Sequence, residues 1–278
     1  MPDAQPRQEG LVVVKVLRGP GEDGEPRAKP VVRPEKRLGV AADPGGRLEQ
    51  LDVARAWAKE MRFRMGVQLL RGIAGAEEAG RGFSAIAEAA LRALMPEVEA
   101  DFARRYGPAP GAGQGGGAAV LAMGRLGSRE MTANSDLDLI LLFDAAGEEA
   151  SDGPKSLSSA VWYARFAQAL IRAVSAKTAE GALYEIDMRL RPSGRQGTVA
   201  TSIEGFRNYH AERAWTWERM ALTRARAVAG HDGPMAAAEA AIAEALGRRR
   251  APEKTRADAA EMRARVAEAA RAGRREPW

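Results

Sequence analysis

Apolar residues recur every three to four positions between Leu51 and Tyr106, in a stretch that is rich in alanine. This spacing lines one face of a helix, so it predicts two or three helices here. The chain changes character at residues 107–117, where glycine and proline dominate. Neither residue suits the interior of a helix or strand, and we expect a loop or a linker. Residues 1–47 are also punctuated by proline and glycine and predict an irregular segment, with one short apolar run at 11–17 that fits a strand.

After the glycine-rich stretch the hydrophobic period shortens. Ala118–Met123 and Leu137–Phe143 are compact apolar runs of the length that is typical of buried strands. Alternation over Ala182–Leu190 predicts a third strand, because successive side chains of a strand point to opposite faces. One of its faces would carry Leu183, Glu185, Asp187 and Arg189.

The remaining pattern is helical. Asp152–Pro154 combines a cap residue with a proline in the first turn, and Thr201–Glu204 has the spacing of a capping box. Trp215–Ala229 predicts a further helix, and the Arg- and Ala-rich residues 247–278 predict an exposed one. The order of strands and helices describes a mixed core at residues 118–232, wrapped by helices on both sequence flanks.

Composition narrows the functional classes. Lys and Arg number 42 against 37 Asp and Glu, which gives a net charge of +5 and a pI near 9.7. This mild basicity suits a phosphate-bearing substrate, but interleaved aromatics and a recognition motif are missing, so we expect no nucleic acid as partner. The lack of cysteine excludes disulfides and thiolate chemistry, and two histidines argue against a multi-histidine zinc site. No apolar run reaches the ~20 residues of a membrane-spanning helix, and the first residues carry no signal-peptide pattern, so we expect a cytoplasmic protein.

The sharpest chemical feature is the acidic pair Asp136 and Asp138, at the start of an otherwise apolar predicted strand. Residues i and i+2 of a strand point to the same side. The two carboxylates therefore project together and repel each other unless a cation lies between them. Mg²⁺ binds oxygen ligands of this kind together with substrate phosphates. The alternative is a solvated pair of acids at a strand entrance.

A glycine-containing turn precedes the acidic pair. Its glycines would let backbone N–H groups approach a phosphate closely, while its serines and arginines add hydroxyl groups and positive charge. The residues concerned are Gly124, Arg125, Gly127, Ser128, Arg129 and Ser135. A glycine turn followed by two strand carboxylates predicts a site for phosphate and Mg²⁺. The alternative is a hairpin turn that merely carries polar residues.

The third predicted strand supplies another carboxylate. Asp187 can lie beside Asp136 and Asp138 on a neighbouring strand, where three carboxylates could hold two metals, or one metal with a base. Arg189 and Arg191 follow it, and their guanidinium groups could neutralise a triphosphate. The alternative for both arginines is a structural ion pair with the carboxylates.

Four motifs in this order resemble the glutamine synthetase adenylyltransferases, also called glutamate–ammonia-ligase adenylyltransferases. The motifs are GRLGSRE at Gly124–Glu130, SDLDL at Ser135–Leu139, YEIDMRLRP at Tyr184–Pro192 and WTWE at Trp215–Glu218. Such enzymes belong to the DNA polymerase beta-like nucleotidyltransferase superfamily. The resemblance therefore implies an α+β fold, with a small mixed sheet flanked by helices and with helical N- and C-terminal extensions.

The resemblance also implies a reaction. Family enzymes carry two nucleotidyltransferase domains: one adds AMP from ATP to a tyrosine of glutamine synthetase, and the other removes it by phosphorolysis. The later motifs resemble the adenylylating copy. By this resemblance Asp136 and Asp138 would bind Mg²⁺ and the ATP phosphates, and Asp187 would share the metal or help deprotonate the acceptor tyrosine. The glycine turn, Arg189 and Arg191 would bind the nucleotide. Phosphorolytic removal of AMP, or an inactive fragment that only binds glutamine synthetase, are the alternatives.

Partners and organisation follow from the same resemblance. Glutamine synthetase is the implied partner, a PII-type nitrogen regulatory protein is a further one, and no membrane is involved. The chain resembles a truncated family member. Its expected parts are an irregular segment at 1–47, a helical lead-in at 48–106, a Gly/Pro loop at 107–117, a nucleotidyltransferase core at 118–232 and a helical tail at 233–278.

Overall fold

The computed structural model of the chain describes residues 47–177, 181–249 and 251–271. The predicted irregular segment at 1–47, apart from its last residue, lies outside the described residues. The last seven residues of the predicted exposed tail lie outside them too.

Eight α-helices occur in the described part of the chain. Helices α1 (Arg47–Leu70) and α2 (Ala76–Tyr106) confirm the helical prediction for residues 51–106, and α8 (Pro252–Arg271) confirms the exposed helix near the end. The others are α3 (Gly124–Ser128), α4 (Ser159–Ser175), α5 (Ile203–Glu212), α6 (Thr216–Leu222) and α7 (Asp232–Gly247).

A small mixed sheet forms the centre of the molecule. Its strands are β1 (Gly117–Ala122), β2 (Leu137–Asp144), β3 (Ile186–Asp187), β4 (Ala200–Ser202) and β5 (Arg226–Gly230). Strand β1 pairs antiparallel with both β2 and β5, whereas β3 and β4 pair in parallel with β2, β3 at its start and β4 nearer its end. The predicted α+β architecture, a small mixed sheet flanked by helices, is confirmed.

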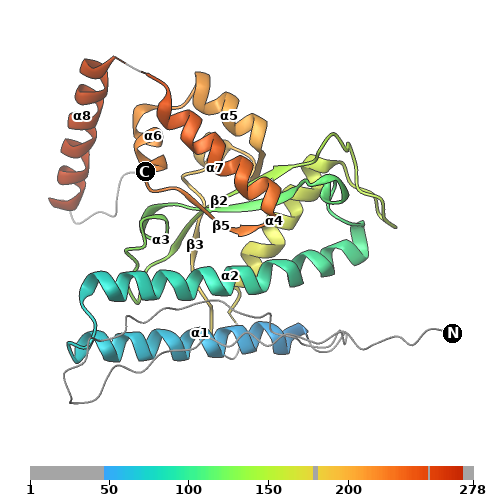
Figure 1. Cartoon of the computed structure of the whole chain (residues 1–278), viewed down its shortest axis with the longest axis horizontal. Helices are drawn as coiled ribbons and strands as arrows, with labels where there is room; N and C mark the ends of the chain where they lie inside the picture. The colour runs from blue at the N-terminus through green and yellow to red at the C-terminus, as the bar shows by residue number, and fades with distance from the viewer. Residues whose placement is uncertain (1–46, 178–180, 250, 272–278) are drawn as a thin grey trace, which may run out of the picture.

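Helices cover both faces of this sheet (Figure 1). Helices α2 and α4 pack on the face to which Leu139 belongs, and α1 packs against α2. Helices α5 and α7 pack on the other face, where Ile140 meets Phe206. Because side chains alternate along a strand, Asp138 lies on the same face as Ile140. The acidic pair therefore begins the strand on the side of α5 and α7.

The predicted third strand is wrong in its length. Within Ala182–Leu190 the strand β3 has two residues, and Leu183 and Tyr184, neighbours in sequence, are both buried. The chain turns directly after β3, because the backbone N–H of Arg189 donates to Oδ1 of Asp187 at 2.8 Å. An aspartate that binds the backbone two residues later favours a turn over a continued strand.

Two predicted helix starts fare differently. Helix α4 begins at Ser159 and not at Asp152–Pro154, because Ser151 closes the intervening loop: its N–H donates to the Leu157 carbonyl at 2.9 Å, and its hydroxyl accepts from the Leu157 N–H at 3.1 Å. The start of α5 is confirmed, with the cap one residue later than predicted. Ser202 is the cap, and its hydroxyl accepts from the N–H of Gly205 at 3.0 Å.

The predicted helix Trp215–Ala229 is wrong in its second half. Helix α6 ends at Leu222, and the chain then forms β5. In this strand Ala227 and Ala229 pair with β1, and the register shifts between them. An Ala-rich segment has no strong preference for a strand. The segment forms a strand because it pairs with the edge of β1, which is far away in sequence.

Residues 107–117 form a packed loop and not a linker. The indole N–H of Trp162 donates to the Gly107 carbonyl at 3.2 Å, and the hydroxyl of Tyr163 donates to the Pro110 carbonyl at 2.6 Å. Both aromatic side chains are fully buried. Helix α4 thus holds the loop against the core.

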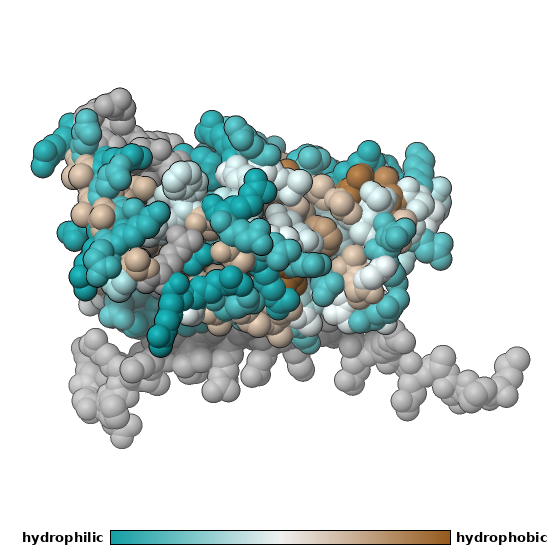
Figure 2. Space-filling model, turned by 90° about the horizontal axis from the view of Figure 1, so that it is seen from above, coloured by the Kyte–Doolittle hydropathy of each residue, from teal (hydrophilic) through white to brown (hydrophobic). Residues whose placement is uncertain are grey.

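The upper face, over α5, α7 and α8, shows mostly hydrophilic side chains with scattered apolar ones (Figure 2). None of the described helices is long and apolar enough to cross a membrane.

Candidate functional site

Two carboxylates from distant parts of the sequence meet in the sheet. Asp138 of β2 and Asp187 of β3 are direct partners in the parallel register of these strands. Directly opposed residues of neighbouring strands point to the same face. The fold therefore brings these two predicted site residues together on the side of α5 and α7.

Helix α3 lies directly against the Asp138 carboxylate. Gly124, its first residue, has φ of +50°, and a Cβ built on it would collide with Oδ2 of Asp138 and stand 3.0 Å from Cγ. The residue before Gly124 also contacts Asp138, because the Met123 N–H donates to the Asp138 carbonyl at 2.8 Å. This position needs glycine for its backbone conformation and for the close approach of the carboxylate.

Gly127 and Ser128 serve the packing of α3. A Cβ on Gly127 would overlap the carbonyl oxygen of Arg224, and the Gly127 N–H donates to the Met123 carbonyl at 2.8 Å. The Ser128 hydroxyl donates to the Gly124 carbonyl at 3.1 Å and to Glu130 at 2.8 Å. Of the two glycines of this turn, Gly124 is therefore the one that contacts a site carboxylate.

The other polar residues of the turn divide into exposed and buried ones. Arg125 and Arg129 are exposed, and so is Asp136, which directly precedes β2. Ser135 is buried, and its hydroxyl accepts from the Thr132 N–H at 2.9 Å. Ser135 thus shapes the loop that leads into the acidic pair.

Arg189 is the cation that pairs with Asp187. Its Nε donates to Oδ2 of Asp187 at 2.6 Å, and its Nη2 lies 2.5 Å from the same oxygen. Asp187 is mostly buried, which opposes its ionisation, but the hydrogen bonds from the Arg189 side chain and backbone outweigh burial and lower the pKa of this carboxyl. The hydrogen bond to Asp187, and beyond it the charges of Asp138 and Asp136, raise the pKa of Arg189. All three acids therefore act on one guanidinium group.

Arg191 has a different environment. Its guanidinium donates to the carbonyls of Gly197 at 3.2 Å, Met188 at 2.8 Å and Arg195 at 3.2 Å. These bonds hold together the turn that follows β3. Of the two predicted ion pairs with carboxylates, the structure contains the one made by Arg189.

The carboxylates fit a site for Mg²⁺ with few protein ligands. Among the described residues, no three Asp, Glu, His or Cys side chains are arranged to hold one ion together, and Arg189 occupies the Asp187 carboxylate. Mg²⁺ is commonly bound by one or two carboxylates, with water and phosphate oxygens in the remaining positions. The donor set of Asp136 and Asp138, both of hard oxygen type, matches this pattern.

A buried carboxylate that the sequence did not single out as a site residue supports the turn after β3. Glu218 is buried and accepts from the Tyr209 hydroxyl at 2.7 Å and from the Trp215 N–H at 2.8 Å. Tyr209 also bonds to Ser193, which lies in that turn. A carboxylate three residues after a helix cap is the sequence signal that identifies Glu218.

The amino-acid sequence of the chain is similar to that of known proteins. The family model described as glutamate-ammonia ligase adenylyltransferase matches residues 27–241. Two curated relatives, from Mesorhizobium japonicum and Brucella suis, are both named bifunctional glutamine synthetase adenylyltransferase/adenylyl-removing enzyme. They are 50% identical over 219 residues and 48% identical over 221 residues. These matches cover 78% and 79% of the chain but 22% of each relative, so the chain spans about a fifth of the length of the curated relatives it matches.

Proposed function

Because this chain belongs to the glutamate-ammonia ligase adenylyltransferase family, we propose that it transfers AMP from ATP to a tyrosine of glutamine synthetase in a Mg²⁺-dependent reaction. The observation that carries the proposal is the register of β2 and β3, which sets Asp138 beside Asp187 with Gly124 against the Asp138 carboxylate. A small mixed sheet with this arrangement also supports assigning the chain to the DNA polymerase beta-like nucleotidyltransferase fold.

In this proposal Asp136 and Asp138 hold Mg²⁺, which would supply positive charge to stabilise the triphosphate and the leaving group. Gly124 lets the Asp138 carboxylate lie directly against the first turn of α3, where a Cβ would displace it. The exposed Arg125 and Arg129 add positive charge on the same turn. The backbone and hydroxyl groups at Gly127, Ser128 and Ser135 keep the turn in shape.

Arg189 would change partners during the reaction. Paired with Asp187, it keeps that carboxylate ionised but weakly basic. A triphosphate is a stronger attractor for a guanidinium group than one carboxylate is. When Arg189 moves to the phosphates, the pKa of Asp187 rises, so this residue becomes a better base for the tyrosine proton or a better metal ligand.

The proposed reaction is an in-line substitution at the α-phosphorus of ATP. The tyrosine oxygen forms a bond to the α-phosphorus while the bond between that phosphorus and the bridging oxygen breaks. The tyrosine proton goes to Asp187 or to water, and pyrophosphate leaves with the electron pair. The arginines and the fixed carboxylates contribute mainly by positioning and by charge stabilisation.

The opposite direction is the second candidate. The names of both relatives include adenylyl removal, and the same carboxylates could serve phosphorolysis of an AMP–tyrosine ester. Glutamine synthetase would be the protein partner in either direction, and a PII-type regulator is a further proposed partner. Since the reaction consumes ATP, we also propose a cytoplasmic location.

One experiment separates these functions. The chain is incubated with unmodified glutamine synthetase, Mg²⁺ and ATP labelled in the α-phosphate, and in parallel with adenylylated glutamine synthetase and inorganic phosphate. Transfer of label to the synthetase, lost in Asp138→Asn, supports the proposed function. Release of ADP from the modified synthetase supports the second candidate. Complex formation without either reaction would refute both and leave a binding role.

A further inference from the structure

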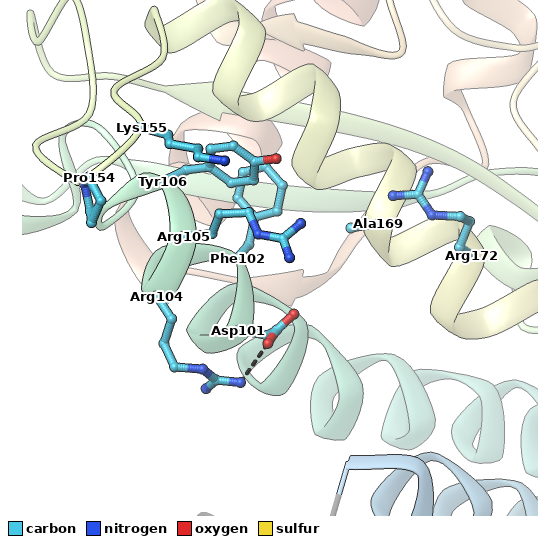
Figure 3. A pocket seen from close by; sticks show the side chains of 9 residues that line it. All are labelled: Asp101, Phe102, Arg104, Arg105, Tyr106, Pro154, Lys155, Ala169 and Arg172. Carbon is cyan, nitrogen blue, oxygen red and sulfur yellow. Dashed lines mark hydrogen bonds and ion pairs between the residues drawn. The ribbon is translucent and has the colours of Figure 1, made fainter. Parts of the chain in front are cut away.

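A hollow with a strongly basic lining lies outside the carboxylate site (Figure 3). It is formed by the end of α2, the loop before α4, and α4 itself, and has a volume of about 570 Å³. Tyr106, the last residue of α2, leads into the packed loop whose end, Gly117, pairs with Asp144. Helices α2 and α4 cover the face of the sheet opposite to that of Asp138, so the sheet separates the hollow from the carboxylate site.

Three segments each contribute a cation to this hollow: Arg105 from α2, Lys155 from the loop and Arg172 from α4. Of the described residues that line it, Asp101 is the one acid, and this carboxylate pairs with Arg104 at 2.5 Å. Figure 3 shows that pair pointing away from the centre, while Arg105 and Arg172 extend toward each other. Among the described residues of the lining, the cations Arg104, Arg105, Lys155 and Arg172 outnumber this one acid.

An aromatic residue of the hollow beside these cations is Tyr106. A hydrogen bond from Arg105, together with the charges of Arg105 and Arg165, lowers the pKa of Tyr106 against the opposing effect of burial. The guanidinium of Arg165 lies 6.0 Å from the centre of the Tyr106 ring. That ring packs on buried Phe102, with 4.5 Å between the ring centres. The hollow thus combines clustered cations with an aromatic wall.

Helix ends alone do not account for this cluster. Arg105 and Arg172 stand in the last turns of α2 and α4, where a cation is favoured by the helix dipole. All three cationic side chains are exposed to solvent. Lys155 lies in a loop, so the dipole of neither helix explains it. Like charges around one open hollow repel each other, and an anion bound between them would remove that repulsion.

We propose that this hollow binds a phosphate-bearing small molecule with at least two negative charges. Its volume falls in the range of about 300–1,000 Å³ that small-molecule sites occupy, which is more than a single phosphate needs. Arg105, Arg172 and Lys155 bind the charged groups, and the Tyr106 ring packs against the organic part. The ligand binds in addition to ATP, because the hollow does not include the carboxylates of β2 and β3.

The test uses calorimetry on the chain without Mg²⁺, with inorganic phosphate and tripolyphosphate as probes. We expect tripolyphosphate to bind more tightly than phosphate, and Arg105→Ala and Arg172→Ala each to weaken it at least about tenfold, as expected for loss of a charge-assisted hydrogen bond. Arg105→Lys, which keeps the charge, should lose less. Melting curves without probe check that each variant folds, and the probe should raise the melting temperature of the wild type.

Matched controls remove the same charge elsewhere. Arg81→Ala and Arg265→Ala remove exposed arginines of α2 and α8 that lie outside the hollow, and both should bind tripolyphosphate like the wild type. Equal weakening in these controls would mean nonspecific charge attraction and would overturn the proposal. Loss of binding in Arg189→Ala but not in Arg105→Ala or Arg172→Ala would place the probe at the carboxylate site and would overturn it too. Equal affinity for phosphate and tripolyphosphate would refute a ligand with several charges.

Discussion

Replacing Gly124 by alanine should disable the site while leaving most of the fold intact. Alanine at φ of +50° costs about 1–2 kcal/mol in backbone strain. The added Cβ would also collide with Oδ2 of Asp138 and stand 3.0 Å from its Cγ, closer than ordinary van der Waals contact. Moving the carboxylate by about 1 Å relieves the collision, and a displacement of that size at a reacting centre costs about 10²-fold in rate. We therefore expect AMP transfer per folded molecule to fall by about 10²-fold.

The control for this prediction is Gly72→Ala. Gly72 lies between α1 and α2 with φ of +66°, and a Cβ on it would meet no atom within 4 Å. Both variants should therefore lose similar stability in a denaturant titration, but Gly72→Ala should keep its specific activity. Transfer of label from α-labelled ATP, normalised to the folded fraction, is the assay. Wild-type specific activity in Gly124→Ala would refute the inference that Gly124 positions the Asp138 carboxylate.

Three further predictions concern single side chains. Asp136→Asn and Asp138→Asn should each abolish transfer while the melting temperature stays equal or rises slightly, because two like charges no longer repel; turnover near wild type in either variant would contradict the metal assignment. Asp187→Ala should lose at least ~10²-fold in rate per folded molecule, whereas a purely structural partner of Arg189 would show a lower melting temperature with specific activity retained. Burial, aided by the charge of Arg219, lowers the pKa of His210 to about 4. Between pH 6.5 and pH 4, His210 is therefore protonated in the unfolded chain but neutral in the folded chain. The free energy of unfolding should fall by on the order of 3 kcal/mol as pH falls through this window, and urea titrations of His210→Phe should lack this contribution.

The elements that the sequence predicted well are those whose pattern is local. The apolar runs at Ala118–Met123 and Leu137–Phe143 correspond to β1 and β2 within one residue at each end, and the three- to four-residue spacing of residues 51–106 gives α1 and α2. In contrast, β5 contains one β-branched residue, Val228, and forms because β1 offers it an edge. Pairing of that kind cannot be inferred from a window of neighbouring residues.

The candidate site was predictable as a list of residues but not as a geometry. The acidic spacing identified Asp136 and Asp138, and the motif around Asp187 suggested a third carboxylate. That Asp187 is held by Arg189, and that Gly124 rather than Gly127 meets a carboxylate, depends on the register of β2 with β3 and on the packing of α3.

The late position of β5 in the chain bears on synthesis at the ribosome. Strand β1 is one of the first strands made, yet Val120 pairs with Ala229 near the other end of the described core. Until β5 has left the ribosome, one side of β1 presents unpaired backbone groups beside apolar side chains, which is the kind of edge that recruits other chains. Any shortened version of this protein that ends before Arg226 should therefore aggregate even when Asp136, Asp138 and Asp187 are all present, and soluble expression requires the chain to extend at least through Gly230.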